Sequence, residues 1–89
     1  MENWEWLTAA RSCTTKACTL LGLLVTPSAI DAICTVYNGK STSSPVVLNV
    51  YLATKDTKNF DFGDGLKLNR GLFLGSFTNI TGVLARWKV

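Results

Sequence analysis

The chain has 89 residues, 47% of them hydrophobic and 17% charged, with a formal net charge of +3. This length supports one domain with one core. The nine basic residues form neither a run nor a stripe interleaved with aromatic residues, so the composition argues against a nucleic-acid-binding protein. A domain this small buries only about 60–65% of its unfolded surface. We therefore expect it to gain stability from self-association, as a dimer or a trimer.

Residues 1–6 are predicted to form an N-terminal arm that precedes a single domain at residues 7–89. Trp4 and Trp6 are two positions apart, so both point to the same side of an extended chain. Tryptophan is enriched among the residues that dominate binding energy at interfaces. The predicted partner-binding residues are therefore Trp4 and Trp6, together with their neighbours Glu5 and Leu7. The alternative is an arm that folds back over its own domain.

The next segments alternate between apolar and other residues, which predicts strands at 7–15, 17–25, 29–37 and 46–53. Residues 17–36 are almost continuously apolar over a length that could cross a membrane. Pro27 and Asp31 interrupt them, however, and a charge near the bilayer centre costs about 2.5–3.5 kcal/mol. Two strands joined by a turn at 26–28 explain the same residues, so we expect no membrane association.

The segment from residue 59 to residue 77 carries the clearest strand pattern. Phe60 and Phe62 alternate with polar residues, as do two leucine pairs further along, and turns are predicted at 63–65 and 69–71. After a turn at 79–82, a last strand at 83–89 places Trp87 in the core. Seven or eight short strands without a helix predict an all-β fold, a two-sheet antiparallel sandwich or jelly roll.

The sequence offers no catalytic constellation, and we expect neither an enzyme nor a cofactor or metal site. Histidine is absent, which removes the commonest general base and metal ligand. Cys13, Cys18 and Cys34 are odd in number and form no Cys-x-x-Cys pair, so free thiols in a reducing compartment are expected. The carboxylates near residue 60 are interpreted as solvated turn residues, with a calcium site as the alternative.

A set of short motifs resembles a known class of proteins. The motifs are Gly-Leu-Leu-Val at 22–25, Thr-Val-Tyr-Asn-Gly at 35–39 before a Ser/Thr loop, Phe-x-x-Gly-Leu at 62–66, Gly-Leu-Phe at 71–73 and Ala-Arg-Trp-Lys at 85–88. In this order they resemble the small β-sandwich virion proteins of tailed bacteriophages, which decorate capsids or form parts of head and tail fibres. Asn38 replaces the turn acid usual in that pattern, and the N-terminal arm and the cysteines have no counterpart in it.

The resemblance implies a structural virion protein, made in the host cytoplasm and assembled into the particle. The expected role is that of a capsid decoration or cement subunit that contacts the major capsid protein or another virion protein. The alternative is a head or tail fibre or neck component that acts as a receptor- or glycan-binding module.

Overall fold

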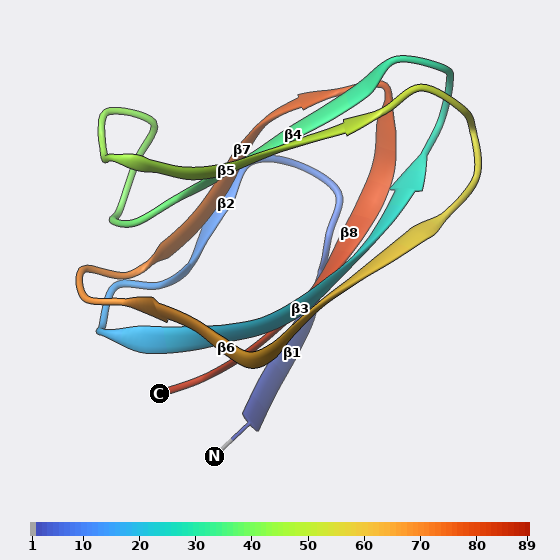
Figure 1. Ribbon diagram of the computed structural model, residues 1–89. Helices are drawn as coiled ribbons and strands as arrows, with labels where there is room; N and C mark the ends of the chain where they lie inside the picture. Colours follow the sequence, from blue (N-terminus) through green and yellow to red (C-terminus); the bar gives the residue numbers. More distant parts are fainter. Residues whose placement is uncertain (1) are drawn as a thin grey trace.

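The computed structural model describes residues 2–89 as two four-stranded antiparallel sheets packed face to face (Figure 1). The strands are β1 (Glu2–Leu7), β2 (Arg11–Thr14), β3 (Cys18–Pro27), β4 (Ala32–Tyr37), β5 (Val46–Leu52), β6 (Lys58–Leu68), β7 (Leu72–Thr78) and β8 (Ile80–Lys88). The predicted all-β two-sheet sandwich is confirmed. No helix among residues 2–89 is long and apolar enough to cross a membrane.

The strand order decides between the two predicted architectures. One sheet has the order β1-β8-β3-β6 and the other β2-β7-β4-β5. The chain therefore pairs like one long hairpin that is wrapped around itself, with the nested pairs β1·β8, β2·β7, β3·β6 and β4·β5. Only the β4–β5 connection stays within one sheet; every other connection crosses to the opposite sheet. Eight strands in this order form a jelly roll.

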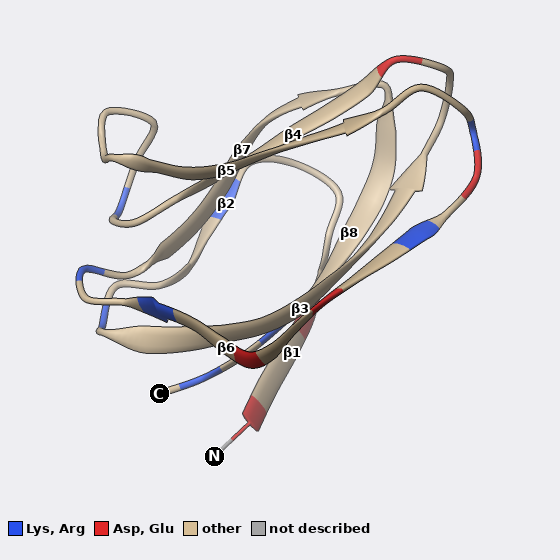
Figure 2. Cartoon of the chain, in the orientation of Figure 1, with Lys and Arg blue, Asp and Glu red and all other residues tan. Residues whose placement is uncertain are grey.

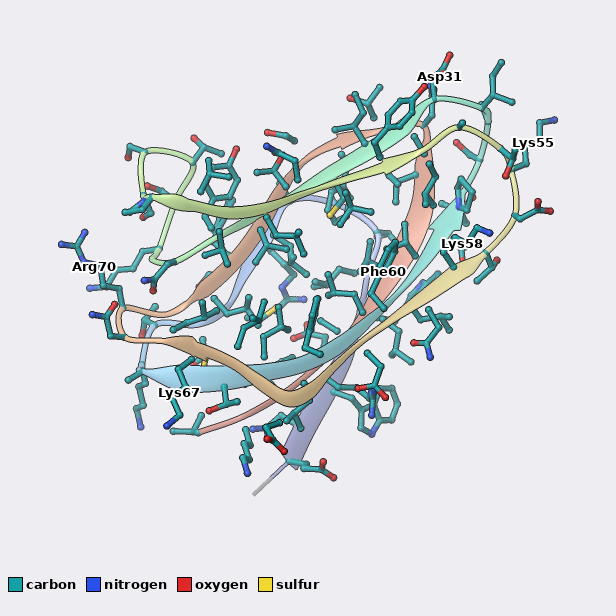
Figure 3. The ribbon with its side chains drawn as sticks, in the orientation of Figure 1. Asp31, Lys55, Lys58, Phe60, Lys67 and Arg70 are labelled. Carbon is teal, nitrogen blue, oxygen red and sulfur yellow. The ribbon has the colours of Figure 1, made fainter. Side chains whose placement is uncertain are left out.

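The core lies between the sheets and is built by the inward-facing residues of every strand. Its largest fully buried side chains belong to Leu7, Leu20, Leu23, Val25, Cys34, Val36, Leu72, Leu74 and Val83. Trp87 is buried against this cluster, as predicted. Phe60 points from β6 into the space between the sheets (Figure 3) and packs against the same cluster.

The prediction of an N-terminal arm at residues 1–6 is wrong for the described part of that segment. Residues 2–7 form β1, which pairs with β8 in a continuous register from Glu2 opposite Lys88 to Leu7 opposite Val83. Without β1, one side of β8 would carry unpaired backbone groups, which are costly where they are shielded from water. The strand predicted at 7–15 is replaced by the end of β1, a connection at 8–10 and the short β2.

The predicted turn at 63–65 is a bulge inside β6. The pairing with β3 passes from Leu66 opposite Leu20 to Asp61 opposite Gly22, so residues 62–65 face a single residue. Gly63 has a φ of +62° and its amide donates a 2.9 Å hydrogen bond to the Asp61 carboxylate. Glycines favour a bulge as readily as a turn, because both use positive φ.

The remaining turns differ in how well they were placed. The turn at 69–71 is confirmed, with a φ of +141° at Gly71. The turn expected at 26–28 falls at 28–31, since β3 continues to Pro27. The turn expected at 79–82 shrinks to Asn79, whose φ is +56° and whose amide group donates a 3.0 Å hydrogen bond to the Ile30 carbonyl. Asn79 thereby joins two of the connections between the sheets.

Candidate interaction surface

The outer face of the sheet β1-β8-β3-β6 displays the two N-terminal tryptophans. Asn3, Glu5 and Leu7 lie opposite Trp87, Ala85 and Val83, which are buried, so the odd-numbered residues of β1 face inward. The even-numbered residues face outward, because successive side chains of a strand alternate. Trp4 is 72% exposed and Trp6 is 44% exposed. Their predicted placement on one side of the chain is confirmed.

An apolar row runs from Trp6 across the sheet. Leu84 of β8 lies opposite Trp6, and Leu24 of β3 lies opposite Leu84. Both leucines are partly buried. The indole of Trp6 covers Gly82, where a Cβ atom would lie only 2.2 Å from the indole Cζ2. We call Trp4, Trp6, Leu24 and Leu84 the tryptophan face.

A polar row lies beside the apolar one. Arg86 stands opposite Trp4, Gly22 opposite Arg86, and Asp61 opposite Gly22. The Arg86 guanidinium crosses Gly22, where a Cβ atom would lie 2.4 Å from Nη2. The tryptophan face is therefore flanked by charges of both signs on the same surface.

Two of the four predicted partner-binding residues do not reach this surface. Leu7 is 1% exposed and belongs to the core. Glu5 points between the sheets and forms an ion pair with Arg11 of β2, which joins the edges of the two sheets. Both errors have the same cause, because the alternation that exposes Trp4 and Trp6 turns residues 5 and 7 inward.

The outer face of the second sheet also carries exposed aromatic and aliphatic residues. Ile33, opposite Tyr51, is 39% exposed and Tyr51 is 59% exposed. The Tyr51 hydroxyl donates a hydrogen bond to the Asp31 carboxylate, and the Thr35 hydroxyl donates one of 2.9 Å to the Asn49 side chain. Figure 2 shows no charge along β4, β5 and β7, as their sequences require. The one exposed aromatic side chain of this face is Tyr51, which is already hydrogen-bonded to Asp31. The tryptophan face has two exposed aromatic side chains.

An open groove of about 580 Å³ lies at one end of the sandwich. Lys67 and Lys88 flank Thr19 across the sheet, and Asn38 and Asn69 line the same groove and share a 2.9 Å hydrogen bond. Figure 3 shows Lys67 pointing away from the core. Amides and ammonium groups at an open rim give polar contacts, but they include no paired acid and base.

The thiols are held in their protonated form. Cys13, Cys18 and Cys34 are free, and the last two are buried within strands. Burial raises the pKa of Cys34 to about 12, and burial together with the charge of Glu5 raises the pKa of Cys13 to about 12. Because the thiolate is the reactive form, these side chains act as small apolar core residues at neutral pH. Within residues 2–89 no group of three or more His, Cys, Asp or Glu residues is placed to hold a metal ion.

No protein-family model, curated protein or solved structure gives a significant match to this chain.

Proposed function

We propose that this protein is a structural subunit that stabilises a particle through protein–protein contacts, as a capsid decoration or cement protein of a tailed-bacteriophage virion. The observation that carries the proposal is the pair of exposed tryptophans on the outer face of a jelly roll. Tryptophan is one of the residue types that are enriched among the hot spots of interfaces. The motif resemblance described above and the use of jelly rolls in viral capsid proteins support the same role.

The proposed mechanism is burial of the tryptophan face against the major capsid protein or another virion protein. Trp4 is 72% exposed and Trp6 is 44% exposed. A tryptophan buries roughly 150–250 Å² when fully covered, so these fractions leave on the order of 200 Å² for a partner. At roughly 25 cal/mol per Å², that area is worth about 5 kcal/mol before the costs of association.

The flanking charges would set orientation more than affinity. Glu2 lies opposite Lys88 and Arg86 opposite Trp4, so the rim of the face presents both signs of charge. Charges at the rim of an interface steer the encounter and reject wrong partners, whereas the buried apolar centre supplies most of the energy. A lattice repeats the contact many times, so each subunit needs only a modest affinity.

The second candidate is a receptor- or glycan-binding module of a fibre or neck, since jelly rolls also occur as lectin domains. The observation in its favour is the position of Trp4, which is 72% exposed and lies in one row with Arg86 and Asp61. A flat aromatic ring beside hydrogen-bonding groups suits a sugar ring.

The test is incorporation of variants into particles. Trp4→Ala combined with Trp6→Ala should reduce the copy number per particle at least tenfold, measured by quantitative gel analysis of purified particles. Tyr51→Ala is the matched control, because it removes an exposed aromatic from the opposite sheet. Substitution is preferable to deletion of residues 1–6, since deletion would remove most of β1 from the sheet.

The outcomes separate the two candidates. Unfolding in urea checks that each variant is folded. A folded double variant that incorporates at the parental copy number would refute attachment through the tryptophan face. Normal incorporation together with loss of binding on a glycan array would favour the receptor-binding module.

A further inference from the structure

The two sheets have four edge strands, β1, β6, β2 and β5, and they differ in how they are protected. An edge strand presents unpaired backbone N–H and C=O groups that can pair with another chain. Natural proteins block such pairing with bulges, lysine, proline, short strands or inward-pointing charges. An edge without these devices is a place where a further strand can be added.

Three of the four edge strands have features that oppose pairing with another chain. β6 contains the bulge at 62–65, two glycines, and the lysines Lys58 and Lys67. β2 is only four residues long and its pairing with β7 shifts register. β5 follows Pro45 and begins with a register shift, although Leu48 to Leu52 pair regularly with β4. β5 is therefore the nearest competitor for an added strand.

β1 is the one edge strand whose pairing is regular along its whole length. All six residues keep register with β8, and they include neither lysine nor proline. β1 lies at the margin of the sandwich in Figure 1. Its charged residues are Glu2, which lies opposite Lys88 at the start of the strand, and the inward-pointing Glu5, whose charge Arg11 already neutralises.

We propose that β1 pairs antiparallel with β1 of a second copy, centred on Trp4. The register follows from the sequence of the strand. With Trp4 opposite Trp4, Asn3 lies opposite Glu5 and Glu2 opposite Trp6, so no like charges meet. Asn3 can then donate a hydrogen bond to the second copy's carboxylate, and cross-strand aromatic pairs are favourable.

The other registers are worse. Moving the centre to Glu5 places two carboxylates opposite each other, which is destabilising. Moving it to Asn3 shortens the overlap of the two β1 strands to residues 2–4. Registers centred between two residues place outward-facing tryptophans opposite inward-facing residues, because side chains alternate along a strand. The Trp4-centred register is the one that pairs residues 2–6 and keeps the outer faces aligned.

The resulting dimer would have one continuous eight-stranded sheet, with four tryptophans on a single outer surface. The inference goes beyond the proposed function, because it concerns the backbone edge of β1 and not the partner that covers the tryptophan face. It holds or fails whether or not the protein belongs to a virion.

Sedimentation velocity on the full chain tests the dimer. The parent should sediment as a dimer at micromolar concentration. Trp4→Lys should raise the dimer dissociation constant at least tenfold, because two lysines would meet at the two-fold axis. Tyr51→Lys, on the competing edge strand β5, should leave the dimer unchanged. A parent that stays monomeric at about 100 µM, or a dimer that only Tyr51→Lys breaks, would overturn the proposal.

Cysteine cross-linking tests the register. Opposite residues of an antiparallel pair have Cα atoms about 4.5–5.5 Å apart, within the range that a disulfide spans. Trp4→Cys should therefore give a disulfide-linked dimer under mild oxidation. Trp6→Cys should not, because the two copies of residue 6 would lie four residues apart along the strand, roughly 13 Å. Equal cross-linking of both variants, or of Trp6→Cys alone, would contradict the register.

Failure of this inference and failure of the proposed function are distinguishable. A monomeric parent whose double tryptophan variant no longer enters particles would refute β1 pairing and leave the particle role standing. A dimer that cross-links at residue 4, but whose double tryptophan variant still incorporates normally, would establish β1 pairing and refute attachment through the tryptophan face.

Discussion

Gly71 lies where the chain turns from β6 into β7, and we predict that Gly71→Ala is strongly destabilising. Its φ of +141° is a conformation that residues with side chains rarely adopt. A Cβ atom there would lie 2.7 Å from the Thr14 carbonyl oxygen and 2.9 Å from the Gly39 carbonyl oxygen. Both neighbours are backbone atoms at the ends of other segments, so they can retreat only if those segments move.

The expected loss has two parts. A positive φ costs about 1–2 kcal/mol for a residue with a side chain. Overpacking against atoms that cannot relax costs about 1–3 kcal/mol. Together they predict a loss of about 2–5 kcal/mol in the free energy of unfolding, measured by urea denaturation with an unchanged dependence on urea concentration.

Gly63→Ala is the matched control. Gly63 also has positive φ, at +62°, but no atom lies within 4 Å of the position that a Cβ would take. Gly63→Ala therefore pays for the positive φ but not for close contacts, so its free energy of unfolding should fall by only about 1 kcal/mol. If Gly71→Ala were as stable as Gly63→Ala, the backbone at Thr14 and Gly39 would have to move away from the new methyl group at little cost, which would contradict this prediction.

Three further predictions follow from close contacts and burial. Gly82→Ala should displace the Trp6 indole that covers it, which would raise acrylamide quenching of tryptophan fluorescence with little loss of stability; unchanged quenching would contradict this packing. Asn79→Ala should cost about 1–3 kcal/mol in urea unfolding, because it loses a tolerated positive φ and a 3.0 Å hydrogen bond to Ile30. Thiol titration should find three reactive cysteines per unfolded chain but slow reaction of the native protein; recovery of one would indicate a disulfide.

The strands that form the core could be predicted from the sequence, because their signal is local. In β5 and β8 the inward residues are apolar and lie two positions apart, so the alternation is visible in a short window. In β3 the alternation is interrupted, because a register shift places both Leu20 and Leu23 in the core. The turn at Gly71 was equally visible, since Asn-Arg-Gly separates two apolar runs. The strand order of the jelly roll could not be predicted from local patterns, because it depends on pairs such as β1·β8 that join the two ends of the chain.

β1 could not be predicted because two of its three inward-facing positions, Asn3 and Glu5, are polar. Asn3 and Glu5 lie at the open rim between the two sheets, where Arg11 neutralises the carboxylate, so the inner face of the strand is apolar only at Leu7. The two tryptophans were correctly placed on one side of the chain for a local reason, the two-residue period of an extended strand. The same period could have placed Leu7 in the core, had residues 2–7 been recognised as one strand.

The buried thiol of Cys34 makes stability depend on pH in the alkaline range. Cys34 is fully buried, and burial raises its pKa from 9.0 to about 12. Between these values the unfolded chain loses the thiol proton while the folded chain keeps it. The unfolded state then binds fewer protons, so the free energy of unfolding falls as pH rises.

This thiol should contribute its full stabilisation below pH 9 and lose about 1.4 kcal/mol for each pH unit above it, up to about pH 12. At pH 10.5 the loss relative to pH 8 is therefore about 2 kcal/mol from this group. Cys34→Ala should be less stable at pH 8, since it leaves a cavity, but its stability should fall less steeply between pH 9 and 10.5. Parallel pH profiles of the two proteins in urea unfolding would show that the Cys34 thiol ionises in the folded state as readily as in the unfolded state.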